Sequence, residues 1–277
     1  MLLTPDDLSC KPFLKWAGGK TQLIEELVKR VPSTYGRYWE PFLGGGALFF
    51  SLRPEFSTIN DLNKELISCY AVVRDKLSEL ITELQEYPHN SDFYYSIRSL
   101  DRAPEFSELS DVKRAARLIY LNKTCFNGLF RVNSKGQFNV PFGRYSNPKI
   151  FNIENIKNCS LQLKRSILLS EPFDTVVESA EKDDFVYFDP PYVPLSPTAD
   201  FTSYLADGFG EAEQELLAVV CLKLHQKGVK WLVSNSNTPI IRELYRGFTI
   251  EAVSANRSIN SKAYKRGPIT ELLIRNY

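Results

Sequence analysis

The chain has few of the residues that bind transition metals or form disulfides. Its 277 residues include two histidines, His89 and His225, and five cysteines that lie far apart and never form a Cys-x-x-Cys pair. Cysteines in this number and spacing are typical of a reducing cytoplasm, and they argue against a structural zinc site or a disulfide framework. We therefore expect no metal centre and no histidine nucleophile.

Long apolar runs are also lacking. No stretch approaches the roughly 18 apolar residues of a membrane span, and residues 1–10 carry Asp6 and Asp7 where a secretory signal would be basic. Hydrophobic residues make up 43% of the chain and charged residues 24%, as is usual in globular proteins. We expect a cytoplasmic protein without a membrane partner, long enough for one α/β domain with a sizeable insertion.

Acidic residues are absent from residues 113–149, although the net charge of the whole chain is only +1. This stretch carries eight basic residues: Lys113, Arg114, Arg117, Lys123, Arg131, Lys135, Arg144 and Lys149. A second basic stretch without acids covers residues 257–266. Exposed charged faces usually mix both signs, so these stretches predict a surface that binds a polyanion such as nucleic acid.

The strongest single signal is the sequence Asp-Phe-Val-Tyr-Phe-Asp-Pro-Pro-Tyr at residues 184–192. The four apolar residues 185–188 predict a strand buried on both faces of a parallel sheet. Pro190 and Pro191 cannot continue a strand, so Asp189, two rigid carbonyl groups and Tyr192 are left at its carboxyl end, where open α/β sheets bind ligands. The alternative interpretation is a turn that only ends the strand.

The polar end of this segment, residues 189–192, suits one kind of chemistry. The exocyclic amino group of a planar heterocycle is a poor nucleophile, because its lone pair is delocalised into the ring. The Asp189 carboxylate and the Pro190 carbonyl can accept its two protons while Tyr192 stacks on the ring, so that the nitrogen can attack a methyl carbon. The sequence predicts methyl transfer by positioning and electrostatics, with Asp189, Pro190, Pro191 and Tyr192 as the catalytic segment.

A strand, a glycine turn and the start of a helix are predicted at residues 37–50. Gly44 and Gly46 are typical of a nucleotide-binding loop, but Phe49 stands where a dinucleotide fingerprint has its third glycine. A nucleoside without phosphates, such as S-adenosylmethionine, fits this loop better. Asp61 follows the next predicted strand and can bind ribose hydroxyls or cap the following helix. Trp16, in an earlier segment, is equally consistent with cofactor stacking and with the core.

Five more strands are predicted after the two early ones, at residues 166–169, 185–188, 230–233, 248–253 and 269–274. Polar residues 234–237 end the strand that begins at residue 230. Together the strands predict an α/β fold with a Rossmann-like doubly wound, mostly parallel seven-stranded sheet, whose last strand turns back antiparallel. Apolar residues at three- and four-residue steps predict one long helix over residues 62–84. We expect residues 64–145 to form an inserted, mainly helical target-recognition domain, and residues 1–63 and 146–277 to form a catalytic domain that binds S-adenosylmethionine.

The insertion ends in a predicted β-hairpin. Apolar residues alternate at 130 and 132 and again at 138, 140 and 142, on either side of Asn-Ser-Lys-Gly at 133–136. The residues on the opposite side are Arg131, Asn133 and Asn139, and Arg144 comes just past the hairpin. Arg and Asn form paired hydrogen bonds with guanine and adenine edges, and apolar residues such as Phe126, Leu129 and Pro141 can contact a thymine methyl or wedge a base step. The alternative is a polar hairpin at the edge of a sheet.

Six motifs together resemble the Dam-type DNA adenine-N6 methyltransferases of the D12 class, including the DpnII-like modification enzymes. In chain order they are Lys15-Trp16-Ala17-Gly18-Gly19-Lys20, Glu40-Pro41-Phe42-x-Gly44-Gly45-Gly46, Asn60-Asp61-Leu62-Asn63, Phe126-Asn127-Gly128-Leu129-x-Arg131, the run at 138–145 and Asp189-Pro190-Pro191-Tyr192. The resemblance covers nearly the whole chain. It implies S-adenosylmethionine as methyl donor, double-stranded DNA as partner, and a flipped adenine, in GATC, as acceptor.

The resemblance also implies roles for individual residues. Those implied to contact the cofactor are Trp16, Lys20, Glu40, Phe42, Gly44, Gly46, Asp61, Phe173 and Asp189. Those implied to bind DNA are Lys15, Phe126, Asn127, Leu129, Arg131, Asn133, Pro141, Arg144 and Arg257. Phe126 and Asn127 match the pair that fills or supports the gap left by the flipped base. Pro172 replaces an acid that family members often carry, so either Glu171 substitutes for it or the cofactor binds more weakly.

Other functions stay open on the sequence alone. N4-cytosine methyltransferases use similar tetrapeptides, often with Ser first, whereas RNA or glutamine methyltransferases would carry Asn at position 189. A non-catalytic DNA-binding regulator is a hypothesis from another class, although every motif position is intact in this chain. A cognate restriction endonuclease is a candidate partner, and the implied location is the cytoplasm, at the bacterial nucleoid.

Overall fold

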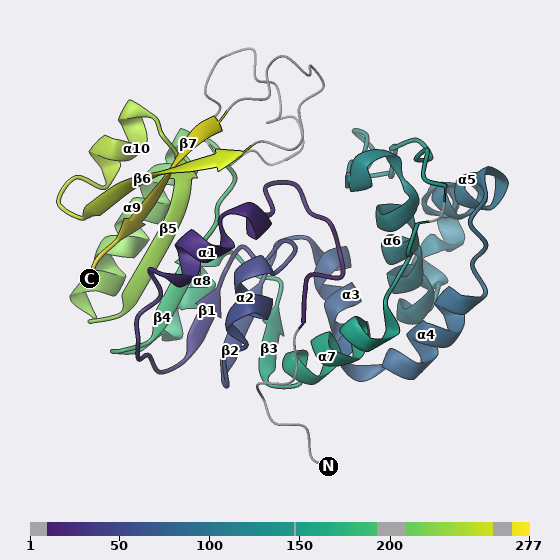
Figure 1. Cartoon of the computed structure of the whole chain (residues 1–277), viewed down its shortest axis with the longest axis horizontal. Helices are drawn as coiled ribbons and strands as arrows, with labels where there is room; N and C mark the ends of the chain where they lie inside the picture. Colours follow the sequence, from purple (N-terminus) through teal and green to yellow (C-terminus); the bar gives the residue numbers. More distant parts are fainter. Residues whose placement is uncertain (1–9, 147, 193–208, 257–267) are drawn as a thin grey trace. The chain divides into compact units, whose positions relative to one another are not determined.

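The computed structural model describes residues 10–146, 148–192, 209–256 and 268–277. A seven-stranded sheet has the strand order β3-β2-β1-β4-β5-β7-β6 (Figure 1). Its strands are β1 (Tyr38–Glu40), β2 (Ser57–Asn60), β3 (Ser166–Leu169), β4 (Phe185–Phe188), β5 (Lys230–Ser236), β6 (Thr249–Asn256) and β7 (Pro268–Arg275). The predicted mixed α/β fold with a mostly parallel sheet is confirmed.

The centre of the sheet is apolar. All four residues of β4 are buried, and β4 pairs in parallel with β1 on one side and with β5 on the other. A strand that is buried on both faces cannot alternate apolar and polar residues, which explains the continuous apolar run in its sequence. β7 runs antiparallel to both β5 and β6, as predicted from the missing helix between the last two strands.

The helices are α1 (Ile24–Val28), α2 (Ala47–Leu52), α3 (Lys64–Asp75), α4 (Leu77–Gln85), α5 (Ser91–Ser99), α6 (Asp111–Thr124), α7 (Ile153–Leu163), α8 (Phe173–Val176), α9 (Glu211–Gln226) and α10 (Pro239–Leu244). Short 3-10 helices include η2 (Lys20–Gln22) and η5 (Phe126–Gly128). Five helices, α3, α5, α6, α7 and α10, begin at an Asn, Ser or Thr whose side chain accepts a hydrogen bond from the backbone N–H three residues on. None of the helices in the described part of the chain has the length and apolar character needed to cross a bilayer.

The prediction of one long helix over residues 62–84 is wrong, because the structure has two helices there. The chain leaves helical geometry at Lys76, where φ is −128° and ψ is 34°. Val73 before the break and Leu80 after it are both buried. The apolar stripe therefore continues across the break, and residue spacing alone does not reveal it.

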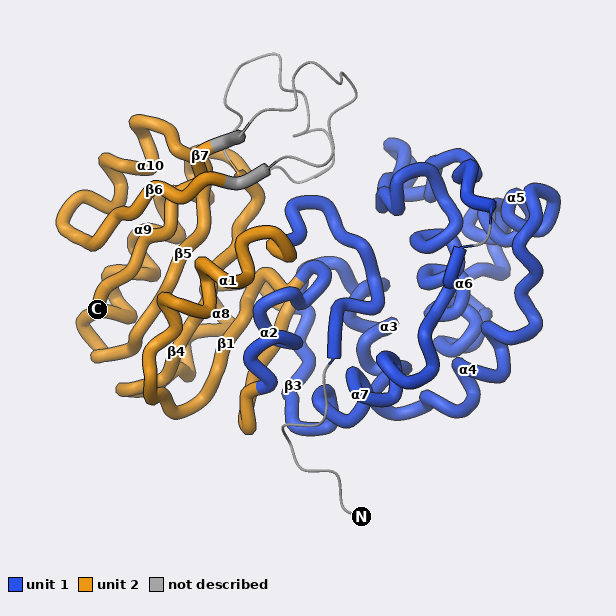
Figure 2. Tube along the Cα trace, viewed as in Figure 1, with its two compact units in different colours: residues 1–19, 44–53, 61–170 blue, residues 20–43, 54–60, 171–277 orange. Residues whose placement is uncertain are grey.

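The structure divides into two compact units (Figure 2). Unit 1 contains residues 1–19, 44–53 and 61–170, and unit 2 contains residues 20–43, 54–60 and 171–277. Unit 1 holds β3 and helices α2 to α7, and unit 2 holds the other strands with α1, α8, α9 and α10. The predicted division into residues 64–145 as an inserted target-recognition domain and residues 1–63 and 146–277 as a catalytic domain stays a prediction.

Candidate active site

Asp189, the first residue after β4, is held by two other side chains of unit 2. Its Oδ1 accepts a hydrogen bond from Ser234 Oγ at 2.7 Å and forms an ion pair with Lys20 Nζ at 2.8 Å. Both contacts use the same oxygen, and Oδ2 has no hydrogen-bond partner among the residues that the structure describes. The carboxylate is therefore oriented through Oδ1, and among the described residues its other oxygen has no donor.

The residues that follow Asp189 are held from three separate elements. The Pro191 carbonyl accepts a hydrogen bond from Gln214 Nε2 of α9 at 2.9 Å, and Gln214 Oε1 accepts one from Asn235 Nδ2 of β5 at 2.9 Å. The Tyr192 hydroxyl donates to Glu271 Oε2 of β7 at 2.7 Å. Polar residues 234–237 are predicted from the sequence for this sheet edge, whereas Gln214 and Glu271 belong to none of the six motifs and are not predicted.

The Tyr192 phenol is a hydrogen-bond donor rather than a base. Burial raises its pKa well above the usual value, and the negative charges of Asp189 and Glu271 raise the pKa further. Lys20 Nζ lies 4.6 Å from the centre of the Tyr192 ring. The ring, fixed at its hydroxyl by Glu271, is therefore the part of Tyr192 that can contact a ligand.

An aromatic cluster in unit 2 contains two of the predicted cofactor residues. The ring centres of Phe42 and Phe173 are 5.2 Å apart, and Phe209 lies 5.5 Å from Phe42 and 5.9 Å from Phe173. Sequence reasoning missed Phe209, which stands two residues before α9. Glu40, a third predicted cofactor residue, is buried at the end of β1 and accepts a hydrogen bond from the Tyr38 hydroxyl at 2.7 Å.

Pro172 precedes Phe173 and provides no carboxylate. The backbone N–H and carbonyl of the neighbouring Glu171 bond to the side chain of Asn60 at 2.9 and 3.0 Å. These contacts fix the backbone beside the aromatic cluster, whereas the Glu171 side chain is exposed. The role of Glu171 as a substitute acid stays a prediction.

The glycine loop of unit 1 is held closed by Asp61. Gly44 and Gly46 have φ values of +48° and +67°, which glycine adopts without strain. Asp61 Oδ2 accepts a hydrogen bond from the Gly44 N–H and Oδ1 accepts one from the Asn63 N–H, both at 2.9 Å. Burial raises the pKa of Asp61, although these two bonds act in the opposite direction. The cap of α3 is Asn63 rather than Asp61, so the capping alternative considered for Asp61 is wrong.

Trp16 lies between the glycine loop and the segment that follows α6. Its ring stacks on Phe130 with ring centres 4.8 Å apart. A Cβ atom added to Gly44 would come within 2.9 Å of Trp16 Cδ1. The indole therefore contacts both loops of unit 1, and its predicted contact with a cofactor stays a prediction.

The predicted hairpin is present as a turn with single antiparallel bridges, Cys125 to Phe142 and Val132 to Phe138, and not as two regular strands. Its turn closes through a hydrogen bond from the Asn133 N–H to the Gln137 carbonyl at 2.9 Å. The Asn139 N–H donates to the Arg131 carbonyl at 3.0 Å, but the Asn139 carbonyl accepts from the Arg131 side chain at 3.4 Å. The outward-facing backbone groups of residues 138 and 140 bond to side chains of other segments. The Phe138 N–H donates to Asp101, and the Val140 carbonyl accepts from the Tyr94 hydroxyl at 2.8 Å.

The residues predicted to bind DNA all belong to unit 1, except Arg257, which lies outside the described residues. Those that are exposed are Lys15, Phe126, Asn127, Pro141 and Arg144, and those that are half-buried are Leu129, Arg131 and Asn133. Arg131 Nε donates to Asn139 Oδ1 at 2.6 Å. The Asn133 side chain bonds within its own turn, to residues 135 and 137.

One residue of the basic stretch does not contribute to the surface. Arg117 is 2% exposed and forms an ion pair with Asp101 at 2.6 Å. It also donates to the Ile97 and Arg98 carbonyls at 3.0 Å. Asp101 lies outside residues 113–149, so the local absence of acids concealed this partner. The prediction of an exposed basic stretch is wrong for Arg117.

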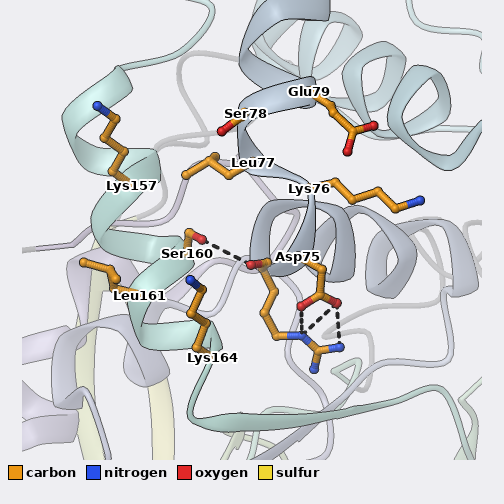
Figure 3. Close-up of a pocket in the computed structure, with 10 residues that line it drawn as sticks. Asp75, Lys76, Leu77, Ser78, Glu79, Lys157, Ser160, Leu161 and Lys164 are labelled. Carbon is orange, nitrogen blue, oxygen red and sulfur yellow. Dashed lines mark hydrogen bonds and ion pairs between the residues drawn. The ribbon is translucent and has the colours of Figure 1, made fainter.

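A surface pocket of about 510 Å³ in unit 1 is formed around the break between α3 and α4 and one side of α7 (Figure 3). Its lining residues are Arg74, Asp75, Lys76, Leu77, Ser78, Glu79, Lys157, Ser160, Leu161 and Lys164. Arg74 pairs with Asp75 at 2.9 Å, so part of the charge is neutralised within the pocket. None of the predicted site residues lines it.

Comparison with known proteins defines the class. Residues 16–259 match the family described as D12 class N6 adenine-specific DNA methyltransferase. The chain is 44% identical over 280 residues to the Type II methyltransferase M1.LlaDCHI of Lactococcus lactis subsp. cremoris, with 100% of this chain and 99% of that protein covered. The chain therefore belongs to the D12 class N6 adenine-specific DNA methyltransferases.

Two further relatives support this assignment. The Type II methyltransferase M.MjaIII of Methanocaldococcus jannaschii is 44% identical over 290 residues, covering 98% of this chain and 100% of that protein. The DNA adenine methylase of Vibrio cholerae is 35% identical over 269 residues, covering 95% of each protein. The predicted adenine-specific DNA methyltransferase is confirmed at this level, and the family uses S-adenosylmethionine as its methyl donor.

Proposed function

We propose that this protein transfers a methyl group from S-adenosylmethionine to N6 of an adenine that is flipped out of duplex DNA, within the sequence GATC. The observation that carries the proposal is Asp189, which Ser234 and Lys20 orient through Oδ1, while Oδ2 has no donor among the residues that the structure describes. The six motifs in family order support it, as do relatives named DNA adenine methylase.

Two acceptors after β4 suit the two protons of an adenine amino group. Asp189 Oδ2 and the Pro190 carbonyl accept them, and the Tyr192 ring stacks on the base. Because both N–H bonds are drawn toward these acceptors, the nitrogen becomes pyramidal and its lone pair is directed at the methyl carbon. Asp189 stabilises the positive charge that develops on N6 until the surplus proton leaves to water.

The residues of the chain fit the methyl donor. When bound, S-adenosylmethionine would supply an electrophilic methyl group on a sulfonium, next to a methionine ammonium and an adenosine, and the bond from methyl to sulfur would break to leave a neutral thioether as the N6–methyl bond forms. An ammonium, that of Lys20, already pairs with Asp189 in this structure, so the carboxylate suits a ligand ammonium. Phe42 and Phe173 offer aromatic faces for the adenine ring. In unit 1 we assign the ribose to Asp61, next to the glycine loop.

Sequence recognition is assigned to exposed and half-buried residues of unit 1. Lys15, Leu129, Arg131 and Pro141 read bases, and Phe126, which is 50% exposed, enters the gap left by the flipped adenine together with Asn127. Base flipping costs a few kcal/mol, which such wedge contacts offset. We further propose that the protein is the modification enzyme of a restriction-modification system, with a cognate endonuclease as partner, because two relatives are named Type II methyltransferases.

The experiment that tests the proposed function is expression in a host without DNA methylation, followed by mapping of modified bases across the genome. We expect N6-methyladenine at GATC sites and no N4-methylcytosine. Genomic N4-methylcytosine without N6-methyladenine would overturn the proposal. N6-methyladenine at another sequence would leave the chemistry standing and refute the GATC assignment.

A further inference from the structure

Asn122, on α6, links two segments that are distant in sequence. It is 0% exposed. Its Oδ1 accepts a hydrogen bond from the Lys15 N–H at 2.8 Å, and its Nδ2 donates to the Lys15 carbonyl at 2.7 Å and to the Gly128 carbonyl at 3.3 Å. One buried amide therefore holds both backbone polar groups of Lys15 and one backbone group of the 126–131 segment.

The Lys15 side chain lies directly against Gly128. A Cβ atom added to Gly128 would come within 2.3 Å of Lys15 Cδ, and Gly128 has a φ of +64°. Lys15 Nζ lies 5.4 Å from the centre of the Tyr145 ring. The Lys15 side chain thus leaves the protein along a path set by Gly128 and Tyr145, and Asn122 fixes the backbone from which it starts.

Packing alone does not explain an amide at this position. Burying a polar side chain is unfavourable unless its hydrogen bonds are satisfied, whereas an apolar residue of similar size would fill the same space on α6. The three bonds of Asn122 all go to segments outside α6. The amide of Asn122 therefore fixes the position of the Lys15 backbone relative to the segment that contains Leu129 and Arg131.

We propose that Asn122 is a positioning residue for sequence recognition, which holds Lys15 and the 126–131 segment in one register on the DNA. The proposal rests on the proposed function, because it takes Lys15 and Arg131 as base-reading residues. Asn122 itself contacts no base. It acts through the position of Lys15, so its loss lowers discrimination between sites more than it lowers the methylation chemistry.

The test compares Asn122→Asp with the matched control Tyr120→Phe, using the full chain. Asp keeps the acceptor for the Lys15 N–H but sets a second oxygen against the Lys15 and Gly128 carbonyls. Tyr120→Phe removes a hydrogen bond from the same helix to the Pro88 carbonyl, 2.9 Å in the parent. The readout is the ratio of kcat/KM for a GATC duplex to that for duplexes with one changed base pair, together with thermal unfolding and S-adenosylmethionine binding.

We expect Asn122→Asp to lower this ratio by about tenfold, in the range of one lost base contact, and Tyr120→Phe to leave it unchanged. In a Lys15→Ala background, Asn122→Asp should lower the ratio no further. Gly128→Ala adds a Cβ atom that would come within 2.3 Å of Lys15 Cδ and leaves the Asn122 side chain itself unchanged. It should lower the ratio in the same way, and it replaces Asn122→Asp in the test if that variant does not fold. If Asn122→Asp, or Gly128→Ala used instead of it, leaves the ratio unchanged, the role of Asn122 is refuted and the proposed function stands. If the parent methylates no adenine, the proposed function is refuted as well.

Discussion

Ser234→Ala removes one of the two groups that orient Asp189 without changing the carboxylate itself. Ser234 is buried, donates to Asp189 Oδ1 at 2.7 Å and lies 3.0 Å from the Tyr187 hydroxyl. A hydrogen bond to a charged group contributes about 1.5–3 kcal/mol, which corresponds to a rate factor of roughly 10 to 150. We expect the methylation rate to fall by a factor within that range, because Lys20 is then the one remaining side chain in the described part of the chain that holds Asp189.

The assay is single-turnover methylation of a duplex with one GATC site, with labelled S-adenosylmethionine and enzyme in excess over DNA. Ser236→Ala is the matched control, because Ser236 stands two residues further along the same strand, is also buried, and its Oγ contacts the side chain of its neighbour Asn235 at 3.5 Å. The control should keep the parental rate. Parental activity in Ser234→Ala, or an equal loss in both variants, would refute the reasoning.

Three further predictions follow from contacts elsewhere in the chain. Glu271→Gln keeps an acceptor for the Tyr192 hydroxyl, whereas Glu271→Ala removes it. Single-turnover rates should therefore decrease from the parent to the Gln variant to the Ala variant, by about tenfold for Ala. Equal rates in the three proteins would contradict a positioning role of Glu271. Arg131→Ala should lower discrimination at one base pair by about 1–3 kcal/mol. The measurement is the ratio of kcat/KM on a GATC duplex to kcat/KM on an altered duplex, and the same ratio in variant and parent would exclude base reading by Arg131. Burial, with the charge of Lys15, lowers the pKa of Lys123 to about 8. The unfolded chain therefore binds more protons between pH 8 and the ordinary pKa of about 10.5, and the stability contributed at this site rises with pH in that window. The difference in unfolding free energy between parent and Lys123→Met should show this rise, and a difference that is constant with pH would contradict it.

The parts of the site that are continuous in sequence could be predicted. An apolar run followed by two prolines defines both a buried strand and its end, since proline cannot continue a ladder. The structure places Asp189 directly after β4 as a result. The glycine loop was predictable for a similar reason, because the φ values of Gly44 and Gly46 are ones that other residues adopt only with strain.

The contacts that hold these segments could not be predicted, because they come from distant elements. Glu271 lies 79 residues after Tyr192, and Gln214 lies 23 residues after Pro191. A single Glu or Gln on a strand or helix has the same local pattern as a surface residue, so no signal marks it as a partner. The hairpin shows the same limit, since alternation predicts two regular strands where the structure has single bridges. Its outward-facing backbone groups at Phe138 and Val140 bond to the distant residues Asp101 and Tyr94.

The most direct test of the central claim measures the product formed by Asp189 variants on a defined duplex. Purified parent, Asp189→Ala and Asp189→Asn are incubated with labelled S-adenosylmethionine and a duplex with one GATC site, and the nucleosides are then analysed. We expect N6-methyladenine from the parent, none from Asp189→Ala and strongly reduced amounts from Asp189→Asn, while all three proteins still bind the duplex. Unmodified adenine in the parent reaction, or parental amounts of N6-methyladenine from Asp189→Ala, would contradict the account.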